Sequence, residues 1–455
     1  MTVDKLPDVA LLEIFDFYMD EAWREVWHTL VHVCRKWRNI VFESPRRLDL
    51  RLYCNARTPV RETLDVWPLL PIVIRGNGHK IWGMGNIIAA LEHNDRICEL
   101  DIFDAPSSQM KVLAAMQRPF PALTSLQLGY ERQTAPVDPG SFLGGSASRL
   151  RSLSLDHMPF PGLPKLLLSA THLVHLKLRR IPGSGYISPE ALVSCLSVLT
   201  SLESLNIGFK SPLCRPDLGG RRPPPRTRTL LPVLTELFFE GVSEYLEDFL
   251  ARIDGPLLDK LDIAFFHQLK FDTPQITQFI SRAPNFNTCN EARVEFSNWG
   301  VYITFPQIFY GGLILNVSCR PSDWQLSCLA QVCSSSFFRA LLPAVERLYI
   351  LEAGLTQLDW QDDIENGQWL ELLHSFTAVT GLYISREFAP RIAPSLQELV
   401  GERVTEVLPA LRTLYFEGPG SLPSGPVQEA IGQFVAARQL VSHPVAVSRW
   451  GRKEF

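Results

Sequence analysis

The chain has 455 residues, of which 46% are hydrophobic and 20% are charged, and its mean hydropathy is +0.04. This composition is that of a globular protein with a large core, and it excludes a wholly disordered chain. The formal net charge of −4 gives no general attraction to nucleic acid or anionic lipid, since both need clustered Lys and Arg, so we expect neither nucleic acid nor membrane as a main partner.

The cysteines favour an intracellular protein with free thiols. Nine of them are spread from Cys34 to Cys333 without a C-x-x-C pair, which fits neither a disulfide framework nor a zinc site. The start, MTVDKLPDV, lacks the apolar stretch of a signal peptide. We therefore expect a cytoplasmic or nuclear protein, or one found in both, with no metal and no cofactor.

The first elements predicted along the chain are helices. Pro7 suits the first turn of a helix, because the N–H that it lacks would have no partner there. A second periodic set, from Val26 to Val41, is longer than one short helix needs, so we expect it to break near Val33 and to end before Pro45. Between Pro7 and Val26, apolar residues recur at helical spacing. They are Leu11, Leu12, Ile14, Phe15, Phe17, Tyr18 and Met19.

Three motifs in this segment come in an order that resembles the F-box, a three-helix module that docks on the Skp-family adaptor of a cullin-based ubiquitin ligase. The motifs are Leu6-Pro7, Ile14-Phe15 and the segment 33–38, VCRKWR. The resemblance implies residues that form or support an adaptor-binding site: Leu6, Pro7, Leu11, Leu12, Ile14, Phe15, Val33 and Trp37. The chain departs from the family's pattern at three positions, which bears on adaptor affinity: Val9 replaces an acidic residue, Ala10 a larger aliphatic one and Asp49 a Trp.

Most of the remaining chain repeats one short pattern, L-x-x-L-x-L. The middle leucines of its first seven occurrences lie about 23 to 32 residues apart, which brackets the period of leucine-rich repeats. Such repeats stack strand on strand, with a helix covering the other side of the core, and none is stable alone. The ten occurrences are 97–102, 123–128, 150–155, 173–178, 202–207, 234–239, 258–263, 345–350, 379–384 and 411–416.

The period loosens between Leu261 and Leu348. There the segments 292–296 and 313–317 are typical of degenerate repeats. The uncharged run 296–319 is interrupted by Pro306 and by a glycine pair at 311–312, so it predicts two buried strands with a turn at that pair, not a membrane span.

We therefore expect an α/β chain in four parts. An F-box at 1–48 is followed by 49–90, which is either a linker or early repeats. An irregular leucine-rich-repeat solenoid at 91–425 has a curved parallel sheet inside and helices outside, and 426–455 form a capping helix and a tail.

An F-box followed by leucine-rich repeats resembles the substrate receptors of SCF-type ubiquitin ligases, and most of all the large F-box families of mushroom-forming fungi. The resemblance implies a non-catalytic subunit. Its partners would be the Skp-family adaptor, through it the cullin and RING subunits, and an unknown target protein. The alternative is a repeat scaffold with a degenerate F-box and no role in ubiquitination.

In each predicted strand, residues that alternate with the apolar ones face the concave side of the solenoid. Aromatic and arginine side chains concentrate binding energy at interfaces, so we expect target contacts there unless helices, loops or the C-terminal segment cover them. The expected residues are Phe103, His175, Lys177, Arg179, Phe238, Arg347, Tyr349, Tyr383 and Tyr415. The Pro-rich basic stretch 209–229 is either a solvated linker or a functional loop. As a functional loop it would capture an acidic or phosphorylated segment, serve as a weak nuclear-import tag or be an SH3-type ligand.

Overall fold

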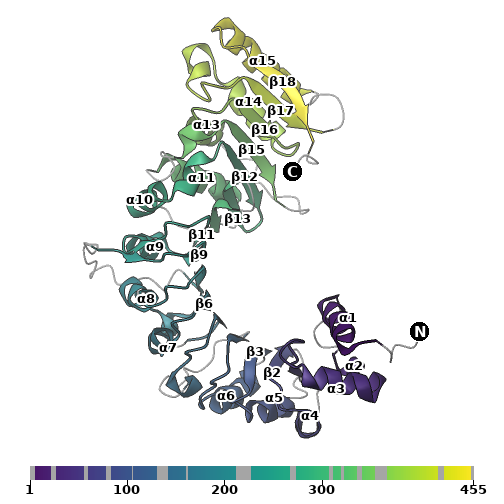
Figure 1. Cartoon of the computed structure of the whole chain (residues 1–455). Helices are drawn as coiled ribbons and strands as arrows, with labels where there is room; N and C mark the ends of the chain where they lie inside the picture. Colours follow the sequence, from purple (N-terminus) through teal and green to yellow (C-terminus); the bar gives the residue numbers. More distant parts are fainter. Residues whose placement is uncertain are drawn as a thin grey trace. The chain divides into compact units, whose positions relative to one another are not determined.

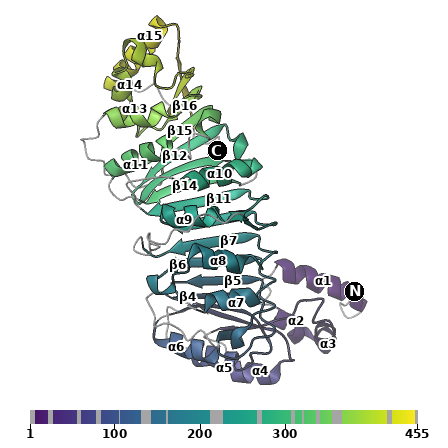
Figure 2. The same ribbon diagram turned by 90° about the vertical axis from the view of Figure 1, so that its left-hand side faces the viewer.

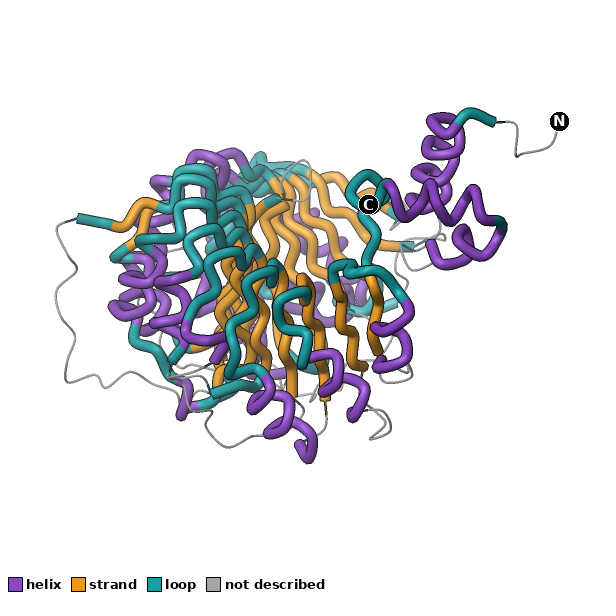
Figure 3. The backbone as a smooth tube through the Cα atoms, turned by 60° about the horizontal axis from the view of Figure 1, so that its bottom comes forward, coloured by secondary structure: helices purple, strands orange, loops and turns teal. Residues whose placement is uncertain are grey.

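In the computed structural model the chain divides into two compact units, Met1–Ile187 with Val198–Leu202 and Ser188–Ser197 with Glu203–Phe455. In each unit the helices that alternate with the strands lie on one face of them (Figures 1 and 2). The strands run side by side, and loops join them to the helices (Figure 3). The residues that the structure describes are 6–21, 27–55, 60–77, 84–104, 106–130, 142–159, 162–211, 227–266, 273–306, 311–318, 322–335, 341–353, 366–418 and 425–451.

The first unit begins with helices α1 (Asp8–Glu21), α2 (Trp27–Val33) and α3 (Arg35–Glu43). The break between α2 and α3 falls next to Val33, where the sequence predicts it. Cys34 has extended backbone there, and its Sγ accepts a hydrogen bond from the Trp37 amide, which caps the first turn of α3.

The inner stripe of α1 forms the core of this helical segment. Leu11, Phe15 and Met19 are four residues apart and buried, because residues at this spacing lie on one face of a helix. The Trp27 indole donates a hydrogen bond of 2.8 Å to the Arg51 carbonyl oxygen and so ties α2 to the chain that leads into the first strand.

The sheet of the first unit is parallel, and its strands follow chain order. The strands are β1 (Leu52–Asn55), β2 (Ile72–Asn77), β3 (Ile97–Asp104), β4 (Ser125–Tyr130), β5 (Ser152–Asp156) and β6 (His175–Ile181). Within 49–90, strand β1 pairs with β2 and β2 pairs with β3 in this sheet, as the strands of the later repeats do. The helices are α4 (Val60–Val66), α5 (Met84–Leu91), α6 (Pro106–Ala115) and α7 (Leu163–Ser169), with short 3-10 turns η3 (Phe142–Gly145) and η4 (Gly183–Gly185).

Leucines in register explain why these strands stack. Leu100, Leu126, Leu153 and Leu176 are consecutive partners across β3 to β6, and all are buried. Full burial of one such side chain contributes about 1.5–3 kcal/mol. In both units, each of the ten predicted repeat segments overlaps a strand, so the repeat prediction is confirmed and the architecture is that of leucine-rich repeats.

The sheet of the second unit runs β7-β9-β11-β14-β13-β12-β15-β16-β17-β18. Its strands are β7 (Ser204–Phe209), β9 (Glu236–Gly241), β11 (Lys260–Phe266), β12 (Glu291–Ser297), β13 (Gly300–Pro306), β14 (Gly312–Ser318), β15 (Arg347–Glu352), β16 (Gly381–Ile384), β17 (Thr413–Glu417) and β18 (Ala446–Trp450). Its helices are α8 (Pro189–Leu196), α9 (Ser243–Leu250), α10 (Pro274–Arg282), α11 (Ser322–Ser334), α13 (Asn366–His374), α14 (Ala389–Gln397) and α15 (Pro426–Leu440). Smaller elements are the strand pair β8 (Thr229–Leu230) and β10 (Ile253–Asp254) and the turns η6 (Pro284–Thr288), η7 (Leu342–Ala344) and η8 (Gly401–Thr405).

An antiparallel insertion interrupts the repeats at β12 to β14. The segments 292–296 and 313–317 are strands, as predicted, but they are not neighbours, because β13 lies between them and is antiparallel to both. The turn Asn298-Trp299 reverses the chain after β12. Gly300 is required next, since a Cβ there would overlap the Val317 carbonyl oxygen. The two strands expected around Gly311 are β13 and β14, and the connection at 307–310 lies outside the described residues.

The C-terminal segment also differs from expectation. Helix α15 is present, but residues 446–450 form strand β18, parallel to β17, where the sequence predicts a tail. Burial of Val445 and Trp450 holds this strand in place. Across the described part of the chain, every helix is too short or too polar to cross a bilayer.

Candidate interaction surfaces

The face of each sheet that lies away from the helices is called the open face here. On the open face of the second unit, strand register aligns one row of side chains across ten strands. In order, the row is Asn206, Phe238, Asp262, Ile314, Thr304, Arg293, Tyr349, Tyr383, Tyr415 and Ser448.

Three tyrosines in this row form a stack. The ring centroids of Tyr349 and Tyr383 are 4.2 Å apart with planes at 17°, and those of Tyr383 and Tyr415 are 4.3 Å apart with planes at 3°. Neighbouring strands are about 4.8 Å apart, so rings at one register position meet face to face. The sequence predicts exposed aromatic side chains here. Tyr349 is buried instead, because rings pack around it, while Tyr383 and Tyr415 are half-buried.

Trp450 packs across the edges of the stack. The sequence did not predict this residue at the site. Its ring centroid lies 5.9 Å from those of Tyr349 and Tyr383, with planes at 78° and 85°. Its indole N–H donates to the Ile384 carbonyl oxygen at 3.4 Å. Strand β18 thus packs Trp450 against the tyrosine stack.

One end of the stack carries a cation. The Arg293 guanidinium carbon lies 5.8 Å from the Tyr349 ring centroid, and its Nε donates to Glu291 at 2.7 Å. Arg347, an expected contact residue, is exposed and lies 3.5 Å from the second oxygen of Glu291. Arg293 was not predicted at this place, because the sequence does not show that β12 pairs with β15.

The environment of the stack raises the pKa of two of its phenols. Burial, and then the negative charge of Glu291, raise the pKa of Tyr349 above its usual value. Burial, and then the neighbouring phenols Tyr349 and Tyr415, raise the pKa of Tyr383 strongly. Tyr349 and Tyr383 therefore hold their phenol protons more tightly than a solvent-exposed tyrosine does.

A second cluster lies further along the same row. The Lys260 ammonium sits 4.9 Å from the centroid of the Phe238 ring, which is half-buried. Asp262 is next to them, and burial raises the pKa of its carboxyl, against the opposing effect of Lys260. Phe238 therefore contributes an aromatic face already occupied by a cation of the same chain.

The open face of the first unit holds the other expected residues. Phe103 is 36% exposed, and its ring lies over Gly129 of the next strand, where any side chain would collide with it. His175 and Arg179 are exposed and Lys177 is half-buried. Burial, and then the nearby charge of Arg179, lower the pKa of Lys177. This face thus carries a short basic strand, β6.

The N-terminal helices form a separate apolar surface. Ile14 and Phe17 are 47% and 65% exposed on the outer side of α1, and Val33 is 59% exposed at the end of α2. Val9 and Tyr18 of α1 are also exposed. Of the residues expected at an adaptor site, the structure exposes Pro7, Ile14 and Val33, half-buries Leu6, Leu12 and Trp37, and fully buries Leu11 and Phe15.

An ionic and hydrogen-bonded contact holds the start of α1 against α3. Lys36 Nζ donates to the Leu6 carbonyl oxygen at 2.8 Å and lies 3.2 Å from the Asp8 carboxylate. The Leu6-Pro7 motif is therefore fixed next to the Val33–Trp37 region, so the exposed residues of both motifs belong to one structural segment.

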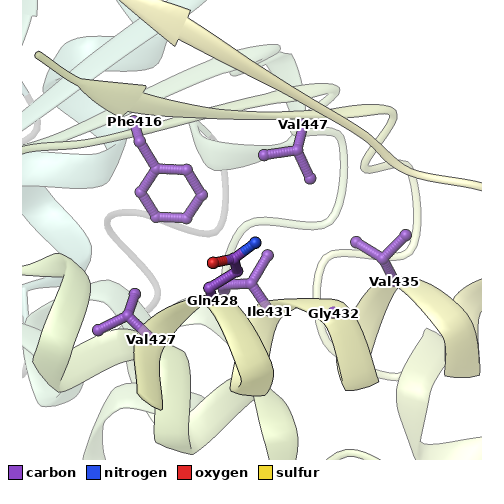
Figure 4. Close-up of a pocket in the computed structure, with 7 residues that line it drawn as sticks. All are labelled: Phe416, Val427, Gln428, Ile431, Gly432, Val435 and Val447. Atoms are coloured by element: carbon purple, nitrogen blue, oxygen red, sulfur yellow. The ribbon is translucent and has the colours of Figure 1, made fainter. Parts of the chain in front are cut away.

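An apolar cavity of about 170 Å³ lies between α15 and the last two strands (Figure 4). Gln428 is the polar residue among those that line it. The lining residues are Phe416, Val427, Gln428, Ile431, Gly432, Val435 and Val447. A void of this size, lined this way, holds only a small apolar group.

The described residues also bear on whether the chain could hold a metal ion. Within the described residues, no three His, Cys, Asp or Glu side chains gather closely enough to hold a metal ion. Of the basic stretch 209–229, residues 212–226 lie outside the described part; Arg228 is described, and its Nε donates to the Ala251 carbonyl oxygen at 3.3 Å.

No model of a known protein family matches the chain, and no curated protein matches it. Among solved structures, a leucine-rich repeat-containing protein, LegL7 from Legionella pneumophila, is similar. It is 13% identical with a TM-score of 0.28, over 84% of this chain and 96% of that one. This structural similarity is weak. The repeat architecture of this chain is established by its own strands and their order.

Proposed function

We propose that this protein is the substrate-recognition subunit of an SCF-type cullin ubiquitin ligase. In this proposal the N-terminal helices dock on the Skp-family adaptor, and the open face of the repeats holds a target protein. The observation that carries the proposal is the apolar outer surface of α1 and α2, with Ile14, Phe17 and Val33 exposed in a segment that resembles an F-box.

This surface needs a partner because α1 carries apolar side chains on two faces, and only one of these faces packs against the rest of the fold. Leu11, Phe15 and Met19 fill the inner face, so Ile14 and Phe17 contribute nothing to this core. Contiguous exposed apolar side chains mark interaction sites, because leaving them in water forgoes the hydrophobic free energy that a partner would supply.

The proposed role is non-catalytic. Holding a target lysine near a charged conjugating enzyme raises the local concentration of the two reactants, as linked binding modules do. The cullin and RING subunits would reach this chain through the adaptor. No cofactor or metal enters this scheme.

One departure from the F-box pattern has a structural role in this chain. Asp49 lies 3.0 Å from Arg51, which also pairs with Glu99 of β3. Where the family often has a Trp, this chain thus has an ionic contact between the segment that leads into β1 and strand β3. Val9 and Ala10 lie on α1 itself, and they keep the alternative open that the chain is an interaction scaffold without a role in ubiquitination.

A titration of the purified chain with the Skp-family adaptor, followed by calorimetry, tests the proposal. We expect Ile14→Asp and Val33→Asp to weaken binding by about tenfold or more, because each puts a charge into an apolar contact. Leu168→Asp is the matched control, since Leu168 is 50% exposed on α7, a helix of the repeats. Absence of binding by the folded wild type would refute the ligase role and leave the scaffold alternative.

A further inference from the structure

Strand β6 carries three basic side chains on the open face of the first unit. They are His175, Lys177 and Arg179, and they alternate with Leu176 and Leu178, which are buried on the other face. His175 and Arg179 are exposed to solvent, and Lys177 is half-buried. Alternate residues of an extended strand are about 6.8 Å apart. These three residues, called the basic row here, thus form a line of nitrogen donors about 14 Å long.

The carboxylate beside the basic row is already engaged. Asp156 of β5 is in register with Arg179, but both of its oxygens accept hydrogen bonds from Arg180, one of them from Nε at 2.6 Å. Arg180 has a left-handed backbone with a φ of 49°, and it is exposed although regular alternation would place it on the core side. Asp156 is therefore held by Arg180 and forms no ion pair with the basic row.

The other described carboxylates on strands β1 to β6 lie near arginines of their own. Glu99 of β3 forms an ion pair with Arg51. Burial raises the pKa of Asp101, and the charge of the nearby Arg75 opposes this effect. In the part of the chain that the structure describes, no hydrogen bond or ion pair engages the side chains of the basic row. Its donors are therefore available to a partner.

The surroundings of Lys177 favour an incoming anion. Burial, and then the charge of Arg179, lower the pKa of Lys177, which shows that its ammonium lacks full compensation. Ser152 and Ser154 of β5 are in register with His175 and Lys177, and both serines are short and half-buried. A group that approaches from the β5 side therefore meets small side chains next to the basic row.

We propose that the basic row binds an extended segment of a partner protein that has carboxylates at alternate residues. In an extended segment, alternate side chains point to one side with the same spacing of about 6.8 Å, so three carboxylates match the three basic residues. Lys177 and Arg179 would form charge-assisted hydrogen bonds with two carboxylates. An imidazole N–H of His175 would donate to the third.

The short length of the basic row favours a peptide over a nucleic acid. A polyanion would extend beyond the three basic residues, and the chain as a whole has a formal net charge of −4, which gives it no general attraction. A peptide segment carries as many charges as the row can pair.

The inference deepens the proposed function and rests on it for one point only, that the bound segment belongs to a target of the ligase. All three residues of the basic row lie on one strand of the first unit. The site can therefore be tested without the adaptor or any identified target.

The test is a titration of fluorescein-labelled TETETET peptide with the full chain at about 20 mM salt, followed by fluorescence anisotropy. Threonine favours an extended chain, so the three Glu side chains fall on one side. The isomer TTEEETT has the same composition and charge but turns its middle carboxylate to the opposite side. We expect it to bind about threefold more weakly, as loss of one partly exposed ion pair does.

Lys177→Met should weaken binding of TETETET by about fivefold, the upper end for a partly exposed ion pair, because Lys177 is half-buried. Arg179→Gln, at an exposed position, should weaken it by about twofold or more. Lys165→Met is the matched control, since Lys165 is exposed on α7 and the change in charge is the same. Its affinity should equal that of the wild type, and circular dichroism should be unchanged in all three variants.

Four results would overturn the proposal. They are equal binding of TETETET and TTEEETT, unchanged affinity of both Lys177→Met and Arg179→Gln, and a loss in Lys165→Met as large as in Lys177→Met. The fourth is tighter binding of either of two other anions. A TQTQTQT peptide with one phosphothreonine would assign the row to a single phosphate, and oligothymidylate would assign it to a nucleic acid.

An adaptor titration on the same preparation separates this inference from the proposed function. Adaptor binding without binding of TETETET would refute the peptide site and leave the ligase role standing. Binding of TETETET without adaptor binding would support the site and assign it to an interaction scaffold.

Discussion

The ring of Phe15 packs against the ring of Trp37, with centroids 4.7 Å apart and planes tilted by 60°. Both residues belong to the motifs that resemble an F-box, yet this contact joins α1 to α3 inside the first unit. Ile14, the neighbour of Phe15 in the chain, points outward and is 47% exposed. The pair Ile14-Phe15 therefore combines one residue for a partner with one for the core.

This division of roles predicts unequal effects on stability. We expect Phe15→Ala to destabilise the helical segment by about 3–5 kcal/mol, because it removes a buried ring and leaves a cavity. Ile14→Ala should change stability by less than about 0.5 kcal/mol, as for an exposed residue. Hydrogen exchange of the α1 amides and urea unfolding measure both. Equal protection of α1 in the two variants would show that the Phe15–Trp37 contact does not hold the helix.

The sequence predicts the repeated strands well for a physical reason. L-x-x-L-x-L specifies which side chains face the core, so a strand at Leu126 or Leu382 follows directly from burial. The position of Tyr349, Tyr383 and Tyr415 is the same in each repeat, which is why their place on one face is also predictable.

The order of the strands is harder to predict. β12 alternates like any repeat, and the reversal of the chain into β13 depends on a two-residue turn and on one glycine, Gly300, which pattern alone does not single out. β18 escapes detection because an edge strand needs fewer apolar residues; most of its side chains are exposed. Arg293 and Trp450 join the tyrosine stack from these two strands, so the complete site is visible only in the fold.

The antiparallel insertion at β12 to β14 leads to a prediction about the stability of the second unit. Gly300→Ala should destabilise the second unit by about 1–3 kcal/mol, because the new methyl group overlaps the backbone of β14 and one strand must move. Urea unfolding of the full chain, followed by tryptophan fluorescence, measures the change. Gly432→Ala on α15 is the control, since its Cβ would meet no atom within 4 Å and alanine favours a helix. A loss of stability in the control as large as in Gly300→Ala would contradict the steric explanation.

Helix α10 depends on a carboxylate from the preceding helix. The two oxygens of Glu247 accept hydrogen bonds of 2.8 Å from the Gln275 and Ile276 amides in the first turn of α10. These amides have no partner within the helix, and the negative charge suits the helix N-terminus. Glu247→Ala should therefore cost about 1–2 kcal/mol of unfolding free energy, as loss of a helix cap does.

Glu247→Gln separates the charge from the hydrogen bonds, because its amide keeps one acceptor oxygen. Its loss of stability should fall between those of wild type and Glu247→Ala, and it should vary less with salt than the wild type does. An unchanged stability of Glu247→Ala would show that water replaces the carboxylate without cost.

The tyrosine stack predicts how stability changes at alkaline pH. Burial raises the pKa of Tyr383 above its ordinary value of about 10, so the folded protein holds this proton more tightly than the unfolded chain does. The resulting stability is fully present below about pH 10, the unfolded value, and is lost as pH rises toward the higher folded pKa. The wild type should therefore lose stability above about pH 10 more steeply than Tyr383→Phe, as measured by urea unfolding at each pH. Tyr302→Phe, which removes a phenol of β13 outside the stack, serves as the control, and a Tyr383→Phe slope equal to that of the wild type would show that the stack does not hold this proton.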